Sequence, residues 1–168
     1  MAKEIPLTKN KITVVSDEDY EFLIQWKWFA DKHKHTYYAA RNFVNEKGQR
    51  RILRMHRVIL GAKSTEAVDH KNGDGLDNRR ENIRLATSQL NQANRGINGN
   101  KTSHFKGVYF CKNVSKWRAK ITVNKKTIDL GVHNREEDAA NAYDVMAESI
   151  FGEFALTNKN GRRASYSR

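Results

Sequence analysis

The hydrophobic and polar residues of the C-terminal part follow patterns that predict regular structure. Residues 116–123 alternate, and four apolar side chains share one face of the expected strand: Trp117, Ala119, Ile121 and Val123. Further strands are expected at 107–110 and 126–130, and apolar residues at helical spacing predict a helix over 134–152. This part is therefore expected to form a three-stranded antiparallel sheet packed on one helix, which leaves the polar face of the sheet exposed.

The N-terminal part predicts a small mixed domain of short elements. Strands are expected at 5–7, 11–15, 36–43, 50–54 and 67–70, and short helices at 17–25, 55–60 and 87–94. The expected fold class of the whole chain is α+β.

A stretch rich in Gly and Asn, with almost no apolar residues, marks the expected domain boundary. We expect an N-terminal domain over 1–95, a linker over 96–103, a C-terminal domain over 104–158 and a basic tail over 159–168.

Charge narrows the class of partner. The chain has 168 residues and a formal net charge of +12 at pH 7. Residues 91–133 hold nine Lys or Arg and one acid, whereas 134–153 hold six acids and one Arg. This segregation favours a polyanionic partner, nucleic acid before an acidic membrane.

Two features exclude other classes. Cys111 is the only cysteine, which excludes an internal disulfide framework and paired-cysteine zinc sites. No apolar run approaches the roughly 20 residues of a membrane helix, and no signal peptide is expected.

Candidate chemistry is concentrated in residues 68–94, which combine carboxylate, imidazole and amide groups. Hydrolysis of a phosphodiester needs a base that activates water and a hard cation that neutralises developing charge. His70 can be the base, and Asp69 with the Asn91 amide oxygen can bind the cation. Adjacent side chains share a site only if the strand ends there, which the glycines in 71–75 permit. The alternative is a hydrogen-bonded structural Asp-His pair.

The same residues resemble the HNH homing endonucleases, a ββα-metal nuclease family. The resemblance lies in successive blocks: Met-His-Arg at 55–57, Val-Asp-His-Lys-Asn-Gly-Asp at 68–74, Leu-Asp-Asn-Arg-Arg-Glu-Asn-Ile-Arg at 76–84, and Ala-Thr at 86–87 through Asn91 and Asn94. It implies that Asp69 and Asn91 hold one divalent metal ion, with His70 as the general base. Asn82 would steady the hairpin and the orientation of His70. Because Asn91 replaces the final histidine of the motif, Mg²⁺ is favoured, with Mn²⁺ as the alternative.

Residues 103–158 resemble the Apetala-type (ethylene-response-factor) DNA-binding domain. The likeness lies in Phe-Lys-Gly-Val-Tyr at 105–109, Lys-Trp-Arg-Ala at 116–119, Leu-Gly at 130–131 and Ala-Ala-Asn-Ala-Tyr-Asp at 139–144. That family lays its sheet in the major groove. Carried over by position, the side chains that would face DNA are Lys106, Tyr109, Arg118, Lys120, Thr122 and Thr127. Several plant arginines and a tryptophan are absent here, so base preference does not transfer.

Further DNA contacts are expected from other basic residues. Arg79, Arg80 and Arg84 would bind phosphates near the cut, and ion pairs with Asp74, Asp77 or Glu81 are the alternative. Arg95 and Lys101, in and beside the linker, would reach the minor groove.

The resulting hypothesis is a site-specific DNA endonuclease of the homing type, a nickase or a double-strand cutter. The expected partner is double-stranded DNA, with no membrane or protein partner, and the chain is expected to be a monomer or weak dimer in the cytoplasm of a host, encoded by a phage or intron. The alternatives are a sequence-specific DNA-binding regulator with an inactive HNH scaffold, and a nuclease specific for branched substrates or RNA.

Overall fold

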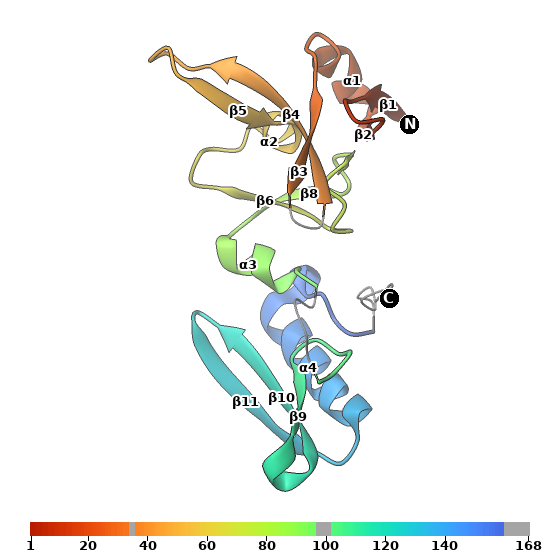
Figure 1. The fold of residues 1–168 in the computed structure, drawn as a ribbon, viewed down its shortest axis with the longest axis vertical. Coiled ribbons are helices and arrows are strands. Elements are labelled where there is room, and N and C mark those ends of the chain that lie inside the picture. The colour runs from red at the N-terminus through yellow and green to blue at the C-terminus, as the bar shows by residue number, and fades with distance from the viewer. Residues whose placement is uncertain (34–35, 97–101, 160–168) are drawn as a thin grey trace. The chain divides into compact units, whose positions relative to one another are not determined.

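A computed structural model describes residues 1–33, 36–96 and 102–159 (Figure 1). The contacts within the chain divide it into two compact units, Met1–Ser88 and Gln89–Arg168. Each unit combines helices with sheets, so the expected mixed fold class holds.

The first unit contains three small sheets and two short helices. Its elements are β1 (Ala2–Pro6), β2 (Ile12–Ser16), α1 (Asp17–Leu23), β3 (Phe29–His33), β4 (Thr36–Val44), β5 (Arg50–Arg54), α2 (Met55–Ile59), β6 (Ala67–His70), β7 (Asp77–Asn78) and β8 (Ile83–Ala86). The sheets have the orders β1-β2-β7, β3-β4-β5 and β6-β8, and only the β2–β7 pairing is parallel among those described. Strands β3, β7 and β8 were not expected from the sequence.

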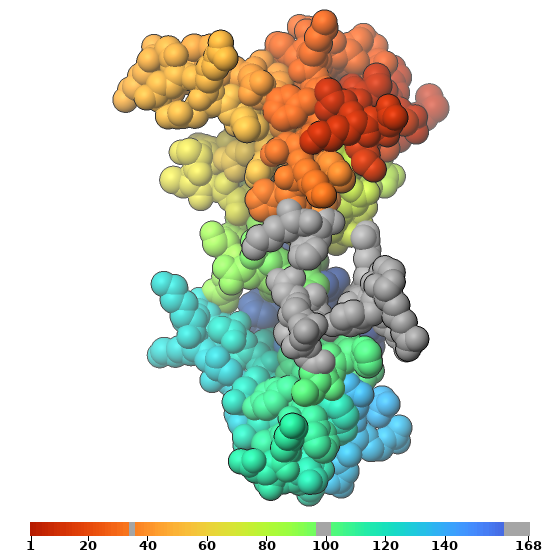
Figure 2. Space-filling model, in the orientation of Figure 1, coloured from red at the N-terminus to blue at the C-terminus, as the bar shows by residue number. Residues whose placement is uncertain are grey.

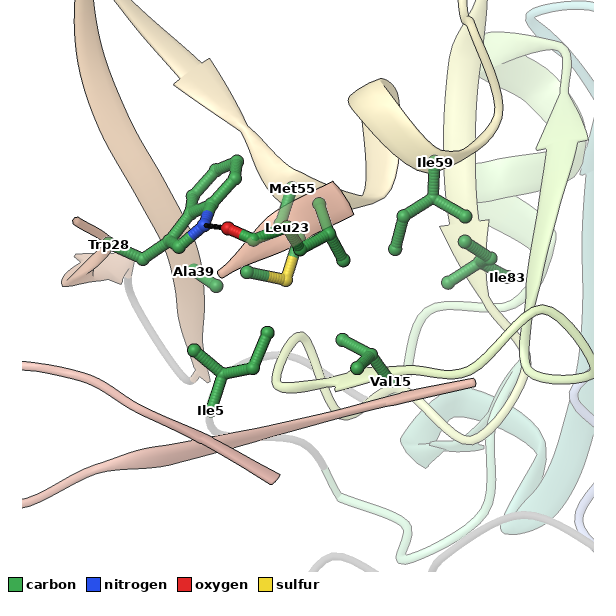
Figure 3. Packing of buried hydrophobic residues seen from close by; sticks show 8 residues of the cluster. All are labelled: Ile5, Val15, Leu23, Trp28, Ala39, Met55, Ile59 and Ile83. Carbon is green, nitrogen blue, oxygen red and sulfur yellow. Dashed lines mark hydrogen bonds between the residues drawn. The ribbon is translucent and has the colours of Figure 1, made fainter. Parts of the chain in front are cut away.

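One core holds the three sheets together (Figure 3). Its eight buried apolar residues are Ile5, Val15, Leu23, Trp28, Ala39, Met55, Ile59 and Ile83. They come from at least one strand of every sheet in the unit and from both helices. The indole Nε1 of Trp28 donates a hydrogen bond of 2.8 Å to the carbonyl oxygen of Leu23, so this large ring is buried without an unpaired donor.

The second unit is a three-stranded antiparallel sheet with a long helix. Its elements are α3 (Ser88–Ala93, which begins at the last residue of the first unit), β9 (Val108–Cys111), η1 (Lys112–Val114), β10 (Lys116–Val123), β11 (Lys126–His133), α4 (Glu136–Phe151) and η2 (Gly152–Phe154). The strand order is β11-β10-β9. Ala119 and Ile121 of β10 are buried in clusters that include Ala139 and Tyr143 of α4. The apolar face of β10 therefore packs on α4, as its alternation indicates.

Helix α3 packs with the second unit, although the sequence suggested that it closes the N-terminal domain at residue 95. The reason is apolar packing: Ala93 is buried in one cluster with Ile121 and Tyr143, and Leu90 packs against it. The contacts therefore divide the chain before most of α3, and residues 97–101 of the expected linker lie outside the described residues.

No helix among the described residues has the length and apolar character needed to cross a membrane.

Candidate functional site

The candidate site is built on the two-stranded sheet of β6 and β8. Asp69 pairs with Arg84 across the strands, and His70 pairs with Ile83. Strand β6 ends at His70, which is the geometry that an Asp-His pair needs to serve one site. Asp69 and His70 are only 4% and 6% exposed, so the protein fixes both side chains.

Asn82 fastens the loop that joins β6 to β7. Its Oδ1 accepts a hydrogen bond of 3.0 Å from the backbone N–H of Asn72, and its Nδ2 donates to Asn72 Oδ1 at 3.0 Å and to the carbonyl oxygen of Asp77 at 2.7 Å. The carbonyl oxygen of Asn82 accepts from the N–H of Lys71 at 2.8 Å. Asn82 therefore shapes this loop by pairing backbone groups that would otherwise lack partners.

The same loop passes close to β4 at Gly75. A Cβ atom at this position would lie 2.4 Å from the carbonyl oxygen of Tyr37 and 2.7 Å from the ring of Tyr38, closer than side chains tolerate. The N–H of Gly75 also donates to Thr36 Oγ1 at 3.1 Å. A glycine is required here because the loop and β4 are in direct contact.

A chain of hydrogen bonds from β2 orients the imidazole of His70. The Thr13 hydroxyl donates to the carbonyl oxygen of Leu76 at 2.7 Å and accepts from Nδ2 of Asn78 at 2.7 Å. Asn78 Oδ1 then lies 3.1 Å from Nε2 of His70. Since the Thr13 hydrogen is already donated, Asn78 presents its oxygen to His70, so Nε2 carries the proton and Nδ1 the lone pair. The resemblance implied that Asn82 steadies the hairpin and the orientation of His70, which stays a prediction; the hydrogen bond between Asn78 and the imidazole was not foreseen.

Two aromatic side chains surround His70 in the interior. The ring of His56 lies 4.9 Å from that of His70 in an edge-to-face arrangement, and the ring of Tyr38 lies 5.9 Å away. Burial, assisted by the neighbouring His70, lowers the pKa of His56 to about 3. Burial also lowers the pKa of His70, although the Asn78 hydrogen bond opposes this. His70 is therefore in its neutral, basic form at physiological pH.

Arg84 binds the carboxylate of Asp69. Its Nε and one terminal nitrogen lie 3.1 Å and 2.9 Å from Asp69 Oδ2. The sequence expectation was that Arg84 binds phosphate near the cut. In the structure this guanidinium holds the orientation of Asp69, and phosphate binding by Arg84 stays a prediction.

Arg79 and Arg80 are also paired with acids. Arg79 makes two hydrogen bonds to the carboxylate of Asp77, at 2.8 Å and 2.7 Å, and lies 2.6 Å from Glu81. Arg80 binds both carboxylate oxygens of Asp19 on α1, at 2.9 Å and 2.7 Å. For Arg79, the ion pairs that were the alternative to phosphate binding are present. The Arg80 pair fastens the loop to α1.

Three expected site residues follow the first unit in the sequence. Asn91 is on α3, half-buried, and belongs to the second unit. Arg95 follows α3 and is exposed. Lys101 lies outside the described residues.

The outer face of the β11-β10-β9 sheet carries five of the expected DNA-contacting side chains, three of them on β10. Arg118 pairs with Tyr109 across β9, and the Lys120 Nζ lies 5.4 Å from the centre of the Tyr109 ring. Thr122 pairs with Thr127 across β11, and their hydroxyl oxygens are 3.2 Å apart. Arg118, Lys120 and Thr122 alternate with the buried residues of β10, so they lie on the face opposite α4, and Tyr109 and Thr127 are cross-strand partners of this set.

Two details of this unit were not foreseen. The Nζ of Lys106 donates to the carbonyl oxygen of Ala93 at the end of α3, so this expected DNA contact is engaged within the protein. Asp129 lies opposite Lys120, and its carboxylate is 3.2 Å from Nε of Arg118. The outer face of β10 therefore combines cations with one acid.

Sequence reasoning missed several residues that organise the site. Thr13 and Asn78 are fully buried, and Asp19 is nearly so. A threonine on the inward side of the apolar run 11–15 was the available signal, because a buried hydroxyl needs a partner. No group of three or more His, Cys, Asp or Glu suited to a metal ion occurs within the described parts of the chain.

The buried His56 predicts how the stability of the first unit depends on pH. Its pKa is about 3 when folded and about 6.5 when unfolded, so the unfolded state binds the proton more readily between these values. The neutral His56 of the folded protein therefore costs no stability above pH 6.5. As the pH falls below 6.5, proton binding by the unfolded state lowers the free energy of unfolding. This decrease amounts to about 2 kcal/mol between pH 6.5 and 5.

Urea unfolding, followed by tryptophan fluorescence, measures the free energy of unfolding at each pH. A Trp117→Phe background ensures that the signal comes from the first unit. The His56→Phe variant keeps a ring of similar size and removes the titrating group. We expect a flatter pH dependence for this variant. Equal slopes with and without His56 would show that His56 titrates normally in the folded protein.

The hydrogen bonds that link Thr13, Asn78 and His70 predict a single tautomer of His70. This tautomer depends on the hydroxyl of Thr13, which is far from His70 in the sequence. In Thr13→Val the Asn78 donor is buried without its partner, which destabilises the protein by about 1–3 kcal/mol and frees the amide to turn. In the folded protein near neutral pH, the ¹⁵N shifts of the His70 ring nitrogens report the tautomer. We expect the Nε2–H form in wild type and in Thr13→Ser, and a mixture in Thr13→Val. A ring that keeps one tautomer in all three would contradict the assigned role of Thr13.

Comparison with known proteins gives the family. A family model described as HNH endonuclease matches residues 54–93, which include β6, β7, β8 and His70. The chain is 32% identical over 155 residues to an uncharacterized HNH endonuclease, L560, of Acanthamoeba polyphaga mimivirus, and the match covers 90% of this chain and 76% of that protein. No solved structure matches significantly. The chain therefore belongs to the HNH endonuclease family.

Proposed function

We propose that this protein is a site-specific DNA endonuclease of the homing type, which hydrolyses a phosphodiester with His70 as the general base. HNH endonucleases act as nucleases on DNA and generally use a divalent metal. The observation that supports the base is the buried imidazole beside Asp69, with its Nε2 proton directed to Asn78.

In the proposed reaction, the Nδ1 of His70 accepts a proton from the water that attacks the phosphorus atom. Asn78 accepts the Nε2–H, so the imidazolium that forms keeps a hydrogen-bond partner and its position. Asn82 contributes indirectly, because it fixes the loop that carries β7 and Asn78.

Asp69 and Asn91 are the residues that we propose as metal ligands. A carboxylate oxygen and an amide oxygen suit a hard divalent cation, Mg²⁺ first and Mn²⁺ as the alternative. Such an ion would neutralise charge on the scissile phosphate and on the leaving 3′ oxygen. Arg84 orients the Asp69 carboxylate.

For sequence recognition we propose an Apetala-like domain over 104–158, with a nuclease domain over 1–95 and a linker between them. The outer face of β10 would lie in the major groove, because a sheet with cations and hydroxyls on one side suits that groove. Because each chain has one candidate active site, a monomer or weak dimer would nick double-stranded DNA. Two sequential cuts would break both strands.

The alternative is a DNA-binding regulator with an inactive nuclease fold. One observation favours it: the Asp69 carboxylate is engaged by Arg84, in the position where a metal ligand is proposed. The two functions differ in whether any divalent metal supports cleavage.

His70→Ala distinguishes them. A plasmid library with random inserts is incubated with the wild-type protein in Mg²⁺ or in EDTA, and the ends are sequenced to find the site. With that site, we expect His70→Ala to lose at least about 100-fold in cleavage rate while its DNA affinity stays within a few-fold of wild type.

The matched control is His104→Ala, which removes an exposed histidine of the second unit and should cut normally. Cleavage that persists in His70→Ala would refute the base. Binding of DNA by wild type without cleavage in any divalent metal would favour the regulator.

The second unit generates a separate prediction. Arg118→Gln/Lys120→Gln removes two cations from the outer face of β10 and should weaken binding to the cognate duplex about 10-fold or more. The control, Lys112→Gln/Arg135→Gln, removes two charges outside the strands of the same unit. Fluorescence anisotropy measures the affinity of both double variants for the duplex. Equal losses in the two variants would indicate that only net charge matters and that this face does not read the DNA.

A further inference from the structure

Three arginines of the candidate site are engaged within the protein, so other cations of the first unit are further candidates for contact with DNA. Arg79, Arg80 and Arg84 each bind a carboxylate through short hydrogen bonds. Residues 1–90 nevertheless carry 17 Lys or Arg and 12 acids. Part of this excess lies in one hairpin that the sequence analysis did not assign to DNA.

This hairpin is the outer part of β4 and β5 with their turn, residues 41–53, which we call the β4–β5 arm. Its base is anchored in the interior, where Ala39 and Ala40 are 1% and 0% exposed. Beyond them the arm leaves the core: Val44 and Ile52 are 62% and 56% exposed. Figures 1 and 2 show the arm extending away from the rest of the first unit.

The arm carries a concentrated positive charge. Its four cations are Arg41, Lys47, Arg50 and Arg51, against the single acid Glu46. Arg51 donates to the Gln49 side chain and the Arg50 carbonyl oxygen, which are neutral. Within the described residues, no carboxylate forms an ion pair with either Arg50 or Arg51. These guanidinium groups are therefore available to phosphates.

The arm is also ordered in advance. Asn45 Oδ1 accepts hydrogen bonds from the backbone N–H groups of Lys47 and Gln49, at 3.1 Å and 2.9 Å, and the Asn45 N–H donates to the Gln49 carbonyl oxygen at 3.0 Å. At the other end, the guanidinium of Arg41 lies 4.6 Å from the centre of the Trp26 ring. An element fixed in this way loses little conformational entropy when it binds.

We propose that the β4–β5 arm binds the DNA substrate in a groove beside the cleavage site. A two-stranded ribbon fits the major groove of B-DNA. The pairing register places Arg50 opposite Val44 on one face and Arg51 opposite Phe43 on the other, so each face of the ribbon presents an arginine toward a wall of the groove. The polyanion is the occupant that this charge favours, because an exposed ribbon with four cations and one acid would repel a second basic copy of itself.

This inference rests on the proposed function, since it names the element by which the nuclease unit holds the DNA. The test uses full-length protein and the duplex that wild type cuts. Arg50→Gln/Arg51→Gln removes the two exposed arginines, and Lys27→Gln/Lys63→Gln removes two exposed cations of the same unit outside the arm. Thermal unfolding of both variants checks that they fold.

We expect the arm variant to bind the duplex about 10-fold more weakly, with its salt-dependence slope reduced by about 1.8, while the control changes less than about two-fold. Hydroxyl-radical footprinting should show that the arm variant loses protection in one backbone segment beside the cut. Arg118→Gln/Lys120→Gln should lose protection in a different segment.

The outcomes separate the two proposals. If wild type neither binds nor cuts DNA, the proposed function fails. If wild type binds but the arm and control variants are alike in affinity and footprint, the arm proposal alone is overturned. A change in oligomeric state on light scattering, without loss of DNA affinity, would also overturn it and assign the arm to contacts between copies of the chain.

Discussion

The buried side-chain amide of Asn78 connects the candidate base to the rest of the first unit. Asn78 is fully buried, pairs with β2 through its backbone, and bonds Thr13 with one side-chain atom and His70 with the other. A buried amide with a missing partner is expensive, so the three residues keep one arrangement. Because β7 pairs with two residues of β2, the N-terminal hairpin helps to place the strand that carries Asn78.

The same dependence explains why the matched family region is not self-sufficient. Residues 54–93 contain the candidate base and the loop that follows it, yet Thr13, Asp19 and Tyr38 come from outside this range. Asp19 binds Arg80, Thr13 orients Asn78, and Tyr38 packs beside His70. The first 53 residues therefore serve as the support that fixes a compact hairpin too small to hold itself rigid.

How much the sequence predicts depends on the range of the interactions. The strand at 116–123 occupies Lys116–Val123, and the helix expected at 134–152 occupies Glu136–Phe151, because periodicity is a local signal. The end of β6 at His70 was likewise readable from the glycines that follow. The hydrogen bond between Asn78 and Thr13, the Asp19 pair of Arg80, and the packing of α3 with the second unit depend on contacts over tens of residues, which no local pattern encodes.

In the first unit, the arginines near the site hold carboxylates in place, whereas the proposed affinity for DNA comes from other cations. Phosphate would compete with Asp77, Asp19 and Asp69 for guanidinium groups that already hold the loop and the candidate ligand in place. Removing such an arginine would leave a largely desolvated carboxylate without its partner, so loss of structure would precede any loss of affinity. Cations on an exposed ribbon have no such constraint. A surface that does not include these buried pairs can therefore bind the polyanion without disturbing the geometry of the candidate base.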